Sequence, residues 1–288
     1  MPDLTTLDPG ALIRQAPTLG SPPAVYQKLV EVLEDPRSGA HEVAAVIGQD
    51  PSLTARLLRL ANSAYFAFDR PVDSVHQAVT FIGLTHVRAI ALATSVTSAF
   101  QHVPPDLIEL EEFWRHSLAV GICARMLAGI RRETNLERFF VAGMLHDVGR
   151  LILYTSAPDS ARTILEHAKD RECLLYEAEM ELTGLDHGTI GGALMEQWNM
   201  PDSLAECVAL HHRPQEAERY PVEACTIHLA DLVANALRLG RSGERMVPPR
   251  WIGLWETLDL DPSLLPELMT STREEYGEVV GAFGFGDG

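Results

Sequence analysis

Apolar residues recur at helical spacing along almost the whole chain, and strict alternation over the length of a strand is hard to find. The first clear example begins at Ser21-Pro22-Pro23, which is typical of a helix N-cap followed by prolines in the first turn, and it ends at Asp35-Pro36. Four apolar side chains form one stripe between these two points. The pattern therefore predicts an all-α fold.

Further helices are predicted on the same grounds, and Val103-Pro104-Pro105 is the clearest break between them. We take this break as the boundary between two packed helical lobes, residues 1–104 and 105–240, followed by a C-terminal helical appendage at 241–288. The helices are predicted at residues 41–47, from 50 onward, and at 74–81, 85–100, 107–130, 135–154, 158–169, 172–183, 187–198, 201–212, 221–239, 248–257 and 261–282.

Charge and composition exclude several classes of function. The 288 residues include 40 Asp and Glu against 23 Lys and Arg, a net charge of −17, so binding to nucleic acid or to an anionic membrane surface is not expected. No apolar run approaches the roughly 18 residues of a membrane span, and the first residues lack the pattern of a secretory signal. We therefore expect a cytoplasmic protein whose four cysteines, widely spaced and without a CxxC pair, are reduced core thiols.

The doublet His146-Asp147 lies inside an almost wholly apolar helical run, FVAGMLHDVG. Burying an ionised carboxylate there costs several kcal/mol unless it is paired or binds a metal, so a cation is expected beside Asp147. Arg150, three residues further on, could be that cation through a plain Asp–Arg ion pair. The doublet alone therefore leaves a metal ligand and an ion pair as alternatives.

Two other helices carry inward polar residues. Asp231 is placed on an apolar stripe by Ile227 and Ala234, at i−4 and i+3. Glu112 and His116 are spaced i and i+4, so both side chains project from one helical face, as ligands supplied by a single helix do. For Glu112, the alternative is a surface interaction at an acidic helix start.

Histidines also stand at predicted helix ends. His211-His212 ends a helix, where two adjacent imidazoles can converge on one ion, and His187 begins another helix after Asp186. The alternative for His187 is an ordinary N-terminal turn capped by Asp186. A single helical histidine is more often a core residue than a ligand, so the argument rests on the set as a whole.

Together these residues form a set of five imidazoles and three carboxylates from five or six helices, which matches two metal ions better than one. Imidazole and carboxylate without thiolate suit iron first, with manganese and zinc as alternatives. Asp147 would bridge the two ions. The candidate metal ligands are Glu112, His116, His146, Asp147, His187, His211, His212 and Asp231.

At these residues the chain resembles the HD superfamily of metal-dependent phosphohydrolases, named for doublets such as His146-Asp147. The first lobe contains DPSLTARLLRLANSAYF at residues 50–66, followed by Ile82-Gly83-Leu84 and by an arginine at position 88, and it resembles the HDOD family. The resemblance spans about residues 15–240. It implies an all-helical bacterial signalling module whose second lobe is an HD-like metal-binding lobe.

By similarity to the related HD-GYP phosphodiesterases, one metal would bind His116, His146, Asp147 and Asp231, the other would bind Asp147, His187, His211 and His212, and Glu112 would be an additional ligand. The chain departs from the HD-GYP pattern after His211-His212, where Tyr220-Pro221 remain but the characteristic Glu and glycines do not. Arg150 replaces the lysine of that family. These departures argue against hydrolysis of cyclic-di-GMP.

Three functions are compatible with this pattern. The first is a signalling protein with a dinuclear metal site, iron being favoured, that acts as a phosphohydrolase. The two ions, with Asp147 between them, would promote hydrolysis of a nucleotide or another phosphoester, and Arg150 would orient the phosphate. The second is a non-catalytic regulatory module that binds a signalling protein, with a structural or vestigial metal site. The third is an oxygen or redox sensor built on a di-iron site.

Overall fold

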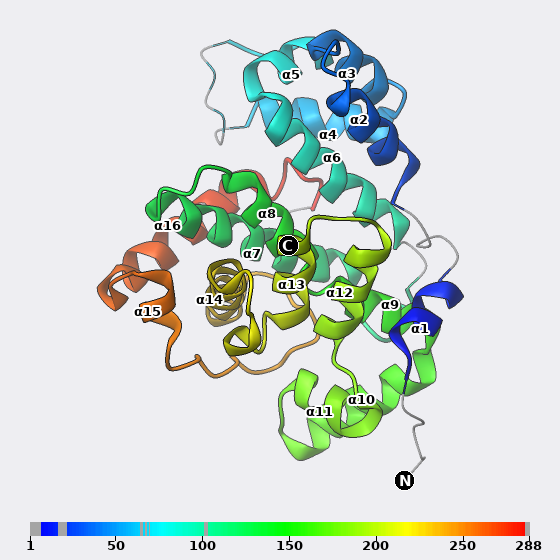
Figure 1. Cartoon of the computed structure of the whole chain (residues 1–288), viewed down its shortest axis with the longest axis vertical. Helices are drawn as coiled ribbons and strands as arrows, with labels where there is room; N and C mark the ends of the chain where they lie inside the picture. Colours follow the sequence, from blue (N-terminus) through cyan, green and yellow to red (C-terminus); the bar gives the residue numbers. More distant parts are fainter. Residues whose placement is uncertain are drawn as a thin grey trace. The chain divides into compact units, whose positions relative to one another are not determined.

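The structure is a computed structural model that describes residues 7–16, 22–63, 66, 68, 70–100 and 103–285, and every regular element within these residues is a helix (Figure 1). The predicted all-α class is confirmed. The chain forms two compact units: unit 1 is Met1–Ser21 with Phe100–Thr272, and unit 2 is Pro22–Ala99 with Arg273–Gly288. The predicted division into two helical lobes and a C-terminal appendage, at residues 104 and 240, stays a prediction.

Unit 1 contains the long helices of the second half of the chain. Helix α7 packs against α8 and α14, and α12 packs against α9 and α13, so that these helices surround a common interior (Figure 1). The elements are α1 (Pro9–Gln15), α7 (Leu110–Ile130), α8 (Leu136–Leu145), α9 (Val148–Ser156), α10 (Pro158–Arg171), α11 (Leu175–Thr183), α12 (His187–Gln197), α13 (Asp202–Leu210), η2 (Pro214–Glu216), α14 (Pro221–Leu237), α15 (Leu254–Leu258), η3 (Pro262–Leu264) and α16 (Leu265–Val279), whose last residues belong to unit 2.

Unit 2 contains five helices from the first part of the chain: α2 (Ala24–Glu34), α3 (Ala40–Ile47), α4 (Pro51–Ala61), α5 (Val75–Ile82) and α6 (Leu84–Ala99). Capping explains where two of them begin, because Asp50 accepts from the backbone N–H of Leu53 and Ser74 from that of Gln77. The predicted cap Ser21 and residues 64–65 of the family motif lie outside the described residues.

Helix α6 is buried on nearly every side, as its Ala-, Ile- and Val-rich sequence predicts. Across the described residues, no single helix is long and apolar enough to cross a membrane. Helices α5 and α6 pass such a test only when taken together, and they are bent by 118° at the break between them.

The predicted continuous helix over residues 135–154 is wrong, because the chain breaks between α8 and α9 at His146-Asp147. Asp147 has φ −95° and ψ 3°, outside the helical region, and the His146 ring bonds the carbonyl of Gly143. A side chain that bonds a nearby backbone carbonyl competes with the helical ladder. The predicted helix 248–257 is also too long, since α15 begins only at Leu254.

Candidate metal centre

The candidate ligands stand mostly at helix ends, where short breaks let neighbouring side chains turn toward one point. His146 and Asp147 occupy the break between α8 and α9. His187 is the first residue of α12, and His211 follows the last residue of α13. The other ligands lie within helices: His116 on α7 and Asp231 on α14.

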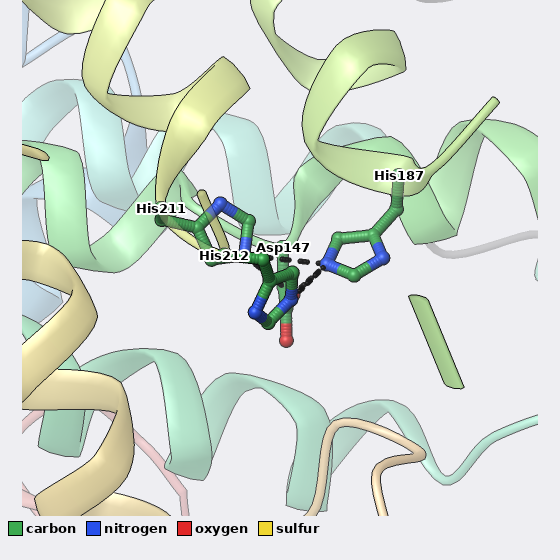
Figure 2. A group of neighbouring side chains, drawn as sticks. All are labelled: Asp147, His187, His211 and His212. Atoms are coloured by element: carbon green, nitrogen blue, oxygen red, sulfur yellow. Dashed lines mark hydrogen bonds and ion pairs between the residues drawn. The ribbon is translucent and has the colours of Figure 1, made fainter. Parts of the chain in front are cut away.

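Four of these residues form a first cluster, the Asp147 group, which consists of Asp147, His187, His211 and His212 (Figure 2). The Nε2 atom of His187 lies 2.9 Å from Oδ1 of Asp147. The same Nε2 lies 3.3 Å from Nε2 of His211 and 3.0 Å from Nε2 of His212. One potential ligand atom from each of the four residues lies within 4.8 Å of all the others.

A second cluster, the Asp231 group, consists of His116, His146 and Asp231. Oδ1 of Asp231 lies 3.1 Å from Nε2 of His116 and 3.7 Å from Nε2 of His146. Asp147 faces this group as well, because its Oδ2 lies 3.3 Å from Nε2 of His146. Its other oxygen, Oδ1, faces the Asp147 group, so Asp147 stands between the two clusters with one oxygen toward each.

The outer ring nitrogens of two histidines are held by backbone carbonyls. Nδ1 of His146 lies 2.7 Å from the carbonyl of Gly143, and Nδ1 of His211 lies 2.7 Å from the carbonyl of Val208. A carbonyl only accepts, so each Nδ1 carries a hydrogen, and Nε2 is the ring atom that faces the centre. Metal-binding histidines are oriented in this way.

The polar atoms at the centre lack the hydrogen-bond partners that their burial requires. His146 and Asp147 are 0% and 1% exposed, yet Nε2 of His146 and Oδ1 of Asp147 have no hydrogen bond of acceptable geometry within the described residues. Neutral imidazoles whose Nε2 atoms face each other, as in His187 and His211, cannot bond each other when both hydrogens are on Nδ1. Cations would satisfy these atoms, and the donor set of imidazoles and carboxylates therefore fits divalent metal ions.

The electrostatics of the centre show the same demand for positive charge. Burial would lower the pKa of His146, but the carboxylates of Asp147 and Asp231 outweigh burial and raise it to about 10. Burial, together with the positive neighbours His146 and His187, lowers the pKa of His211 to about 3. The buried carboxylates of Asp147 and Asp231 therefore favour positive charge beside them, which a divalent metal ion would supply.

Glu112 lies outside both groups. Its carboxylate is an ion-pair partner of Arg115, with 3.2 Å between Oε1 and Nη1, and its side chain is 26% exposed. Its backbone carbonyl accepts a hydrogen bond from the N–H of Arg241. The structure therefore brings seven of the eight predicted ligands together, and Glu112 forms an ion pair with Arg115 instead.

Arg150 lies beside Asp147, as its spacing predicts, with 3.4 Å between Nη1 and Oδ2. It is only 1% exposed, and Nη1 also donates to the carbonyl and hydroxyl oxygens of Ser242, at 2.8 and 2.7 Å. The ion pair and the converging ligand atoms thus coexist, although they were alternatives at the sequence level. Arg150 is thus as deeply buried as Asp147, which it contacts.

Sequence reasoning missed two buried residues that support the ligands. Oε2 of Glu179 lies 2.6 Å from Nδ1 of His187. Nδ1 of His228 donates to the carbonyl of His211 at 2.8 Å, and Nε2 of His228 accepts from the N–H of Trp251 at 3.3 Å. Glu179 sits among the acidic residues of α11, so only its helical spacing from buried neighbours could have distinguished it.

Comparison with known proteins identifies the fold. A family model described as HDOD domain matches residues 19–214, which is more than half of the chain. The chain belongs to the HDOD domain family. The resemblance predicted from the motif at residues 50–66 and from the His146-Asp147 doublet is confirmed.

Solved structures of HDOD proteins share this fold. An HDOD domain protein with unknown function from Geobacter sulfurreducens is 26% identical with a TM-score of 0.78, over 90% of this chain and 92% of that one. A protein from Shewanella amazonensis SB2B named "Putative phosphohydrolase" is 27% identical with a TM-score of 0.75, over 95% and 98% of the two chains.

An uncharacterized protein from Treponema pallidum (strain Nichols) is 24% identical over 220 residues, and the match covers 75% of this chain but 42% of the relative.

Proposed function

We propose that this HDOD protein binds two divalent metal ions at the Asp147 and Asp231 groups and hydrolyses a nucleotide or another phosphoester there. The observation that carries the proposal is the position of Asp147, whose two oxygens face the two clusters separately. A carboxylate placed in this way could be shared by the two ions of a dinuclear centre. The similar structure from Shewanella amazonensis SB2B, named "Putative phosphohydrolase", supports the same class of reaction.

The donor set favours iron, with manganese and zinc as alternatives, because it contains imidazole and carboxylate but no thiolate. Two such ions would supply Lewis acidity toward a phosphoryl oxygen and would lower the pKa of water bound to them. The protein's own contribution is to hold the imidazole rings in fixed orientations. His146 and His211 achieve this through their bonds to backbone carbonyls.

Substrate would approach from the side of His212. This is the one member of the two groups that is partly exposed, whereas His187 and His211 are fully buried. The half-buried ring of Tyr176 stacks on His212, with the ring centroids 4.4 Å apart and 15° between the planes. An aromatic ring at the entrance suits a substrate with a planar group, such as a nucleotide base.

A second candidate is a regulatory module in which the metal is structural and the output is a contact with a signalling protein. The burial of the other six ligands favours this candidate, because a hydrolase must admit both phosphoester and water. Unit 2 also carries an aromatic cluster of Phe66, Phe68 and Phe81, with Phe81 53% exposed. Exposed apolar clusters of this kind commonly mark protein contacts.

Metal content tests the proposal. The full chain is purified without added metal or chelator and measured by plasma mass spectrometry, and we expect two equivalents of iron, manganese or zinc. The variants His187→Ala and His211→Ala should lose metal, whereas Glu112→Gln should keep it because Glu112 lies outside both groups. Less than about a tenth of an equivalent, with no uptake on anaerobic reconstitution, would refute the metal centre.

Activity separates the two candidates once metal is present. The metal-replete protein is assayed with bis(p-nitrophenyl) phosphate, p-nitrophenyl phosphate, nucleoside triphosphates and cyclic dinucleotides. Turnover that disappears in His187→Ala and survives in Glu112→Gln supports the hydrolase. Full metal occupancy without turnover of any of these substrates supports the regulatory module and directs the search to protein partners.

A further inference from the structure

Two buried charged side chains lie next to the metal centre without belonging to either group of ligands. Arg150 and Glu179 are each only 1% exposed. A buried charge without a partner costs several kcal/mol, so each must be compensated by its surroundings. The contacts of Arg150 and Glu179 therefore indicate the role of each residue.

Glu179 contacts His187 at two points. Its Oε2 accepts from the backbone N–H of His187 at 2.8 Å and lies 2.6 Å from Nδ1 of the same residue. The ring is thereby held at the nitrogen that faces away from Asp147, while the backbone at the start of α12 is held by the same oxygen. The other oxygen of Glu179, Oε1, lies 3.9 Å from Nε of Arg150.

Arg150 joins Glu179 to Asp147. Its Nη1 lies 3.4 Å from Oδ2 of Asp147, and the same nitrogen donates to Ser242, which follows α14. Since Asp147 Oδ1 contacts Nε2 of His187, the four side chains form a closed ring of alternating acidic and basic groups. A ring of this kind fixes the direction of each member, because moving one of them leaves the next charge unpaired.

We infer that Glu179 is a positioning residue that orients His187 toward the metal of the Asp147 group, and that Arg150 balances the charges of Glu179 and Asp147 rather than touching the phosphate. This inference rests on the proposed metal centre and assigns it a carboxylate and a guanidinium that are not ligands. A carboxylate on the outer nitrogen of a ligating imidazole fixes its tautomer and makes it a stronger donor.

The inference predicts a selective effect on one of the two metals. Changing such outer partners weakens metal affinity by about 10- to 100-fold. Glu179→Gln keeps an oxygen for the N–H groups of His187 but removes the charge, so we expect the lower end of this range. Glu179→Ala removes the oxygen as well, so we expect the upper end. The Asp231 group, which Glu179 does not contact, should keep its affinity.

The experiment titrates the metal-free full chain with zinc by competition with a chromophoric chelator. The matched control is Glu181→Gln, the same substitution on the same helix, at a side chain that is 57% exposed and contacts His167. We expect Glu181→Gln to bind two equivalents of zinc with the affinities of the wild type. We expect Glu179→Gln to bind one equivalent with unchanged affinity and the other with weaker affinity. Unchanged affinity of both equivalents in Glu179→Gln overturns the inference while leaving the proposed centre intact. A wild type that binds no zinc refutes the centre itself.

A second measurement needs no variant that could fail to fold. In the zinc-loaded wild type, NMR of ¹⁵N-labelled imidazoles should show a slowly exchanging proton on Nδ1 of His187, at the low field typical of a bond to a carboxylate. A His187 ring coordinated through Nδ1, or one whose Nδ1 proton exchanges freely with water, contradicts the role of Glu179.

Discussion

Replacing Gly149 by alanine tests the contact that brings His187 to Asp147. Gly149 is the second residue of α9, and a Cβ atom placed on it would lie 2.0 Å from the carbonyl oxygen of His187 and 2.7 Å from the backbone nitrogen of Gly191. Both atoms belong to the backbone of α12, so no side-chain rotation relieves the overlap. Because Cβ atoms essentially never approach closer than 3.0 Å, the two helices must separate by 3.0 − 2.0 = 1.0 Å.

The cost of this separation follows from the packing of α9 against α12. Overpacking a core costs about 1 to 3 kcal/mol, and a clash between two backbones belongs at the upper end. A loss of about 3 kcal/mol corresponds to a fall in Tm of roughly 6 to 12 °C in a protein of this size. The displacement also moves His187 away from Asp147, so zinc affinity at the Asp147 group should fall.

The assay is differential scanning calorimetry of the metal-free full chain, followed by zinc titration. The matched control is Gly129→Ala on α7, where an added Cβ would meet only Cδ1 of Leu136 at 4.0 Å. Alanine is the better helix former by about 0.5 to 1 kcal/mol, so this control should melt at or above the wild type. If Gly149→Ala melts within about 2 °C of the control, the close approach of α9 and α12 is refuted.

Three further predictions concern other residues. Burial raises the pKa of the Cys225 thiol to about 11 from its usual 9.0, so this thiol should resist iodoacetamide at pH 8 until urea unfolds the chain. Because the folded protein holds this proton more tightly than the unfolded chain, the free energy of unfolding should fall as pH rises from 9 to 11, and urea titrations that show it rising would contradict the assignment. Gly240 has φ +75°, and a Cβ atom there would lie 2.2 Å from the backbone nitrogen of His116. Gly240→Ala should therefore lower the free energy of unfolding, measured by urea titration, by more than about 1 kcal/mol. An unchanged free energy would argue against this backbone conformation. Asn235 donates a hydrogen bond to Oδ1 of Asp231 at 2.7 Å. In the metal-free protein, Asn235→Ala should therefore lower the free energy of unfolding by about 1.5 to 3 kcal/mol in urea titration. A loss below about 0.5 kcal/mol would show that this hydrogen bond contributes little.

The fold class was predictable because helical periodicity is a local property of the sequence. Capping residues such as Asp50 and Ser74 stand where the structure begins α4 and α5. The break between α8 and α9 was not predictable in this way, since the run around His146 is apolar and continuous. The break depends on a bond from that ring to the carbonyl of Gly143, which periodicity does not report.

The ligand set was predictable to the extent that a polar residue on an apolar stripe requires a partner. Asp231 illustrates this success, because its spacing from Ile227 and Ala234 predicts an inward carboxylate and the structure buries it at 4% exposure. Glu112 illustrates the limit. Glu112 and His116 do lie one turn apart on α7, as their spacing predicts. Helical spacing does not show which neighbouring side chain pairs with Glu112, and in the structure that side chain is Arg115.

The sequence by itself determined the helices, the family and the candidate ligands, since each follows from residue type and from spacing along one segment. The tertiary structure decided which candidate ligands lie together, because seven residues from five places in the chain meet only when α7, α8, α9, α12, α13 and α14 pack together. It also revealed Glu179 and Ser242, whose contacts with His187 and Arg150 join segments far apart in the chain. Such long-range contacts produce no periodic pattern in the sequence, so they cannot be predicted from it.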